Sequence, residues 1–94
     1  MDQLRKRLLY KACHRGMAET DEMIGGFAKA NLGQMSELQL SQFDALLDQL
    51  DIDLFNWIMG REPIPDAYNG EIMKMIIDFK ESQKIIVKYR KNNK

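Results

Sequence analysis

The sequence contains one cysteine and one histidine among its 94 residues. A single cysteine, Cys13, cannot form a disulfide within the chain, so the cysteine content does not indicate an oxidising compartment. A structural zinc site usually has four ligands, and no second cysteine or histidine is available to complete one. Adjacent helical residues point about 100° apart, which separates Cys13 and His14 as a nucleophile and its base. We therefore predict no catalytic residue and no metal site, with Cys13 packed and His14 at a surface or helix end.

Long apolar runs are also missing. No stretch approaches the roughly 20 apolar residues of a membrane span, and the N-terminal sequence has no apolar run long enough for a secretory signal peptide. We expect a soluble, cytoplasmic protein without direct membrane insertion.

The chain has no net charge, with 14 basic and 14 acidic residues. A general nucleic-acid-binding domain usually has a clear basic excess, so this balance argues against that class. The charges are nevertheless divided, because residues 1–16 carry net +4, residues 17–79 net −9 and residues 80–94 net +5. We interpret these regions as a solvated and partly self-neutralising surface. The alternative is a small regulatory, antitoxin-like protein that binds nucleic acid through its basic ends.

Hydrophobic residues make up 45% of the chain, which is enough for one modest core. We predict a single domain over residues 1–94, with residues 1–3 and 91–94 as frayed tails. Apolar residues recur at helical spacing in five segments and no strand pattern is convincing, so the fold class is all-α, a small five-helix bundle.

Glycine and capping residues set the expected boundaries. Gly16, in a positive-φ conformation, is expected to end the first helix, and Gly33 to close the second. Gly25 and Gly26 inside the second helix indicate either close packing against the backbone or a weak helix.

The third helix is the clearest segment, because Ser36 and Gln39 form a capping box ahead of an apolar face. That face is expected to bury four residues: Phe43, Leu46, Leu47 and Leu50. Asp51 or Asp53 is expected to cap a short fourth helix that ends at Gly60, before Pro63 and Pro65. A long final helix follows Asn69 and Gly70, with one face formed by Ile72, Met75, Ile76, Phe79 and Ile86.

No glycine-rich phosphate loop is present, because GGFAKANLG has neither the spacing nor the Lys-Ser/Thr ending of a P-loop. The carboxylates of Asp44, Asp48, Asp51 and Asp53 do not follow the calcium-loop pattern. Their simplest roles are solubility and capping.

A compact polar cluster remains: Arg15, Gly16, Met17, Glu19 and Asp21. It places one planar cation and two carboxylates at the start of the second helix, where the helix dipole favours negative charge. From the residues alone, helix capping is the simpler interpretation, and a docking surface for a partner is the functional one.

The run from Arg15 to Asp21 resembles the RGxxExD signature of the succinate dehydrogenase flavinylation factors. The segment Asp53-Leu54-Phe55-Asn56-Trp57 resembles a second motif, DLFNW, of the same family. The resemblance covers residues 4 to about 80. It implies a five-helix bundle that is not an enzyme but an assembly factor or chaperone, which assists covalent attachment of FAD to another protein.

The resemblance also implies a partner and a contact surface. The partner would be the flavoprotein subunit of succinate dehydrogenase, with the related fumarate reductase as a further candidate, and not a nucleic acid. FAD would be attached to that partner, with no cofactor bound stably by this chain. Arg15, Gly16, Glu19 and Asp21 would form the contact surface with Met17 as an apolar neighbour, whereas Phe55 and Trp57 are expected in the core.

Overall fold

The computed structural model describes residues 1–92, and the surroundings of side chains through Gln83. Residues 1–92 form five α-helices and two single-turn 3-10 helices, and no strand. They are α1 (Gln3–Cys13), α2 (Ala18–Asn31), η1 (Leu32–Gln34), α3 (Glu37–Leu47), α4 (Asp51–Ile58), η2 (Asp66–Tyr68) and α5 (Glu71–Asn92). The predicted all-α, five-helix fold is confirmed.

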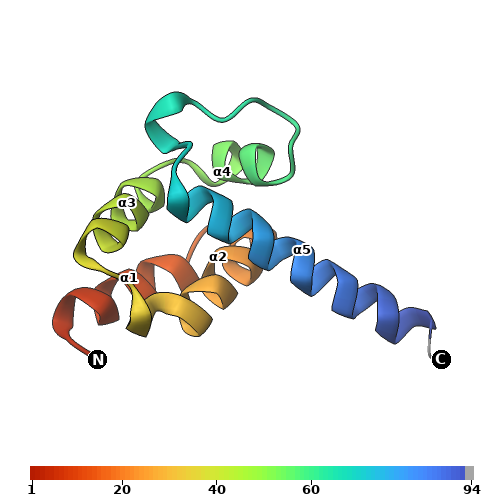
Figure 1. Cartoon of the computed structure of the whole chain (residues 1–94), viewed down its shortest axis with the longest axis horizontal. Helices are drawn as coiled ribbons and strands as arrows, with labels where there is room; N and C mark the ends of the chain where they lie inside the picture. The colour runs from red at the N-terminus through yellow and green to blue at the C-terminus, as the bar shows by residue number, and fades with distance from the viewer. Residues whose placement is uncertain (93–94) are drawn as a thin grey trace.

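The helices enclose one core. In Figure 1, α1 and α2 lie against each other, α3 lies beside α1, and α5 crosses α2 before extending beyond the other helices. The largest fully buried hydrophobic side chains come from α1 to α5 and η1: Leu8, Ile24, Phe27, Leu32, Phe43, Leu54, Ile58, Ile72, Met73 and Ile76. The surroundings of Ile86, predicted on the apolar face of the last helix, lie outside the described residues. Of the predicted tail at 91–94, residues 91–92 are the last of α5 and residues 93–94 lie outside the described residues.

Two helix starts show how local sequence sets boundaries. The Ser36 hydroxyl accepts a hydrogen bond from the Gln39 N–H at 3.2 Å, and the Gln39 side chain accepts one from the Ser36 N–H at 2.9 Å. The predicted capping box is therefore confirmed. The predicted cap of α4 is wrong, because its N-cap is Leu50, which makes no side-chain cap, and Asp51 is already the first helical residue.

Gly16 does not adopt a positive φ, so that expectation is also wrong. Among residues 1–92 the residue with a left-handed φ is Gly60, at +75°. Gly60 follows α4, where its N–H donates to Trp57 O at 3.2 Å and the next N–H, of Arg61, donates to Asn56 O at 2.8 Å. The predicted stop at Gly60 is confirmed, whereas α1 ends by other contacts described below.

Gly25 allows α1 and α2 to approach closely. A Cβ atom at Gly25 would lie 3.1 Å from Cys13 Sγ and 3.3 Å from Cys13 Cα, closer than ordinary packing. The close-packing interpretation of this glycine is confirmed. Cys13 is partly buried against it, and the exposed His14 caps α1 with its ring stacked on Tyr10.

Two core predictions need correction. Leu50 is 68% exposed, because α3 ends at Leu47 and Leu50 belongs to the turn that begins α4. Phe55 is only partly buried, and the Arg61 guanidinium lies over its ring at 5.1 Å from the centroid. Trp57 is buried as expected and stacks on Tyr68, with ring centroids 5.4 Å apart.

Candidate functional site

The five predicted site residues lie in and just after the turn that joins α1 to α2. Arg15 is largely enclosed, with 9% of its side chain exposed. Its guanidinium donates from Nη1 to Leu47 O at 2.8 Å and from Nη2 to Gln49 O at 2.7 Å. The Arg15 guanidinium, which was expected at the contact surface for a partner, is therefore hydrogen-bonded within the chain, at the C-terminal end of α3.

Asp51 completes this arrangement from the first turn of α4. One oxygen of its carboxylate accepts a hydrogen bond from Arg15 Nε, and the other accepts one from the Gly16 N–H at 2.6 Å. Partial burial alone would raise the pKa of the Asp51 carboxyl, but the Arg15 hydrogen bond, the Gly16 N–H and the Arg15 charge outweigh it. The pKa is therefore held below its usual value.

Asp21 and Met17 close the other side of the turn. The Asp21 carboxylate accepts a hydrogen bond from the Arg15 backbone N–H at 2.5 Å. Met17 is the N-cap of α2, and its carbonyl accepts from the Asp21 N–H at 3.0 Å and from the buried Thr20 hydroxyl at 3.1 Å. Asp21 thus holds the Arg15 backbone in the turn and does not cap α2, which has no side-chain cap, and Met17 is a partly buried neighbour.

Glu19 differs from the other charged residues of the cluster. It is exposed in the first turn of α2, and within the described part of the chain its carboxylate takes part in no hydrogen bond or ion pair. A side chain that is charged, exposed and unpaired is free to bind a group on another molecule. Glu19 is therefore the member of the cluster whose polar group remains available.

Gly16, three residues before Glu19, is also exposed and lines a shallow pocket of about 340 Å³. A Cβ at this position would lie 3.2 Å from Asp51 Oδ2, which is tighter than ordinary van der Waals contact. The glycine is required here for space beside the carboxylate, and not for an unusual φ.

Sequence reasoning missed Asp51 as a member of this site. We assigned it to capping or solubility from its place among the carboxylates around a helix end. It lies 35 residues from Gly16 along the chain, and no local pattern links the two positions. The available signal was its place two residues before Asp53, where the second family-like motif begins.

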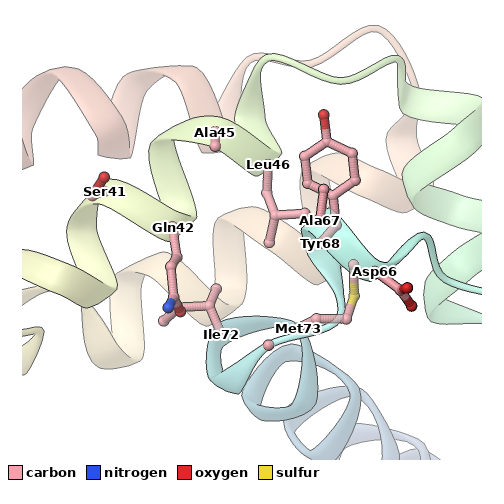
Figure 2. Close-up of a pocket in the computed structure, with 10 residues that line it drawn as sticks. Ser41, Gln42, Ala45, Leu46, Asp66, Ala67, Tyr68, Ile72 and Met73 are labelled. Carbon is pink, nitrogen blue, oxygen red and sulfur yellow. The ribbon is translucent and has the colours of Figure 1, made fainter.

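A further pocket lies away from this turn. Figure 2 shows a pocket of about 370 Å³ between α3, η2 and the start of α5, with Gln42 and Asp66 at opposite sides. Gln42 Oε1 is buried there without a hydrogen-bond partner. Through the described residues, no group of three or more His, Cys, Asp or Glu side chains could hold a metal ion, and no helix is long and apolar enough to cross a membrane.

The fold and the cluster define a small helical protein whose candidate site is an exposed turn and not an enclosed cavity. A model of the family described as the flavinator of succinate dehydrogenase matches residues 6–80. The chain belongs to this family, which confirms the resemblance inferred from the two motifs.

Relatives from distant organisms agree with this assignment. "Succinate dehydrogenase assembly factor 2, mitochondrial" of Dictyostelium discoideum is 40% identical over 76 residues, covering 81% of this chain and 54% of that protein. The protein of the same name from Danio rerio is 40% identical over 85 residues, or 88% and 54% of the two chains. "FAD assembly factor SdhE" of Acetobacter pasteurianus is 35% identical over 74 residues, or 79% and 68%.

The chain spans about half the length of the mitochondrial relatives it matches. These names are those of assembly factors and not of enzymes, in agreement with the prediction that the chain is not an enzyme.

Proposed function

We propose that this chain is an assembly factor that binds the flavoprotein subunit of succinate dehydrogenase and promotes covalent attachment of FAD to it. Its family is described as the flavinator of succinate dehydrogenase, and a relative is named as an FAD assembly factor. Fumarate reductase, which contains a related flavoprotein, is a second candidate partner. In this proposal FAD is attached to the partner, and this chain holds no cofactor stably.

The observation that carries the proposal is the exposed, unpaired carboxylate of Glu19 in the first turn of α2, three residues after the exposed Gly16, whose backbone N–H is held by Asp51. The Gly16 position has no side chain, so a partner's backbone can approach it closely. A carboxylate that enters an interface needs a donor or a cation opposite it, and this requirement gives specificity. Docking on a turn that is already ordered also costs less conformational entropy than docking on a mobile loop.

The charged side chains of the cluster other than Glu19 are engaged within the chain. Arg15 and Asp51 are occupied by each other, and Asp21 is occupied by the Arg15 backbone. The proposed role of the chain is therefore to bind and hold the flavoprotein in a conformation in which the flavoprotein forms its own bond to FAD.

The test compares two carboxylates on α2, Glu19 and Glu22, which are both exposed and lie three residues apart. Apo-flavoprotein subunit is incubated with FAD and with wild-type chain, Glu19→Ala or Glu22→Ala, and covalent flavin is read by in-gel fluorescence after denaturation. We expect Glu19→Ala to weaken flavoprotein binding at least tenfold and to slow flavin attachment, because the partner group opposite Glu19 loses its pair. Glu22→Ala is expected to behave as the wild type.

Failure of the wild-type chain to bind the flavoprotein or accelerate flavin attachment would contradict the proposal. If the chain instead binds a nucleic-acid probe, with an affinity that falls steeply as the salt concentration rises, the antitoxin-like alternative is favoured.

A further inference from the structure

We infer that Asp51 is a positioning residue for partner docking, because its carboxylate fixes the Gly16 backbone that the partner is to meet. The inference rests on the proposed function, since it concerns the surface that would bind the flavoprotein. Asp51 itself is not assigned a contact with the partner.

The two oxygens of the Asp51 carboxylate accept hydrogen bonds from different donors. One oxygen pairs with the Arg15 side chain, which is in turn bound to the carbonyls of Leu47 and Gln49, so this half of the carboxylate is locked to the end of α3. The other oxygen accepts the Gly16 N–H at 2.6 Å. The carboxylate therefore connects a glycine outside any helix to a packed junction between α3 and α4.

Gly16 needs such a connection. A glycine loses more conformational freedom on ordering than any other residue, so an untethered Gly16 would sample many backbone conformations. The neighbouring backbone contact, from the Arg15 N–H to Asp21, fixes the residue before Gly16 but leaves the Gly16 N–H to Asp51 alone. Without Asp51, ordering the turn would become part of the cost of binding.

The chemistry of the site makes Asn a sharp replacement for Asp51. A carboxylate can accept at both oxygens, whereas an amide has one acceptor oxygen and an NH₂ group that donates. Asn at position 51 can therefore satisfy the Arg15 Nε or the Gly16 N–H, but not both. Its size is nearly unchanged, so the packing around α4 is retained.

Asp48 provides the matched control. It lies at the end of α3, three residues before Asp51, and its carboxylate pairs with Lys11 at 2.8 Å. Asp48→Asn removes the same charge from the same junction without touching Gly16.

The experiment measures three properties of the wild type, Asp51→Asn and Asp48→Asn, after circular dichroism has shown each to be folded. They are hydrogen exchange of the Gly16 amide, affinity for the flavoprotein subunit, and the rate of flavin attachment at saturating chain concentration. In Asp51→Asn we expect Gly16 exchange to rise and affinity to fall, each at least tenfold. The saturated rate should stay close to wild type, because only docking is impaired. Asp48→Asn should match the wild type in all three.

If Asp51→Asn does not fold, Asp51→Glu replaces it, because this variant keeps the negative charge but displaces the oxygens by one methylene. Affinity and Gly16 protection are expected to fall together there as well. Wild-type affinity combined with fast Gly16 exchange, in either variant, would overturn the inference. So would fast exchange of the Gly16 amide in the wild type itself, a result that requires neither variant nor partner.

These outcomes are separable from failure of the proposed function. If the wild type neither binds the flavoprotein nor promotes flavin attachment, the function fails whatever the Gly16 exchange shows. If the wild type acts and Asp51→Asn binds equally well with a released Gly16, the function stands and the positioning role fails.

Discussion

Two cationic side chains, Lys11 in α1 and Arg15 in the turn after it, contact the α3–α4 region in different surroundings. Lys11 is 33% exposed and reaches Asp44 at 3.1 Å and Asp48 at 2.8 Å. Arg15 is 9% exposed and binds Asp51 together with two backbone carbonyls. Lys11 meets carboxylates that are themselves 37% and 65% exposed, whereas the Asp51 side chain is 18% exposed.

The difference teaches that an ion pair fixes a backbone only where it is enclosed and geometrically satisfied. The Lys11 ammonium is a point charge whose partners remain hydrated, so either contact can be exchanged for water. The planar Arg15 guanidinium fills three acceptor positions at once, and its loss would leave buried groups without partners. We therefore assign the order of the α1–α2 turn to Arg15 and Asp51.

The largest effect is expected for Arg15→Ala. Removing the guanidinium leaves the Asp51 charge half-paired and two carbonyls at the end of α3 without their donors. We expect a loss of about 2 to 4 kcal/mol in the free energy of unfolding, measured by urea denaturation. A loss below about 1 kcal/mol would mean that the Arg15–Asp51 pair contributes no more to stability than the exposed ion pairs of Lys11.

The second prediction concerns pH, through Asp51. Its folded-state pKa is lowered from the usual 3.8, so its contribution to stability is present above that pH and is lost as pH falls through the lowered folded-state pKa. We expect wild-type stability to drop below about pH 4 and Asp51→Asn to show a shallower drop. Urea denaturation at pH 6 and at pH 3 measures both, and identical pH dependence would contradict the assigned pairing.

The smallest effect is expected for Lys11→Ala. The Asp48 hydrogen bond raises the pKa of Lys11 more than burial lowers it, and the Asp44 hydrogen bond adds to the rise. This contribution is therefore present below about pH 10.5 and is lost as pH rises through the folded-state value. Because the pair is exposed, we expect the melting temperature to fall by less than about 5 °C at neutral pH. Scanning calorimetry in low and high salt would sharpen the comparison, since Lys11 should be the more salt-sensitive of the two cations.

Local patterns predicted most of the fold, whereas the tertiary part of the site was not visible in them. The Ser36–Gln39 capping box and the stop at Gly60 follow from residues within a few positions of each feature. The motif located the turn, but the partner of Arg15 depends on how the first turn of α4 lies against the α1–α2 turn.

The errors have the same origin. Leu50 continued the apolar spacing of α3, but the helix had already ended and the residue faces solvent. The positive φ expected of Gly16 would have explained this glycine by local conformation. The structure explains it by a tertiary contact, because the position leaves space beside the Asp51 carboxylate.

The most direct test of the account is the flavoprotein affinity of Gly16→Arg, measured beside its melting temperature. The new Cβ would crowd Asp51 Oδ2, and the long side chain would occupy the exposed position where the partner is to approach. We predict a folded protein whose melting temperature falls by roughly 4 to 8 °C, as a loss near 1 kcal/mol produces in a domain of this size, and whose affinity falls at least tenfold. Unchanged affinity in a folded Gly16→Arg protein would contradict the claim that the turn between α1 and α2 is the docking surface.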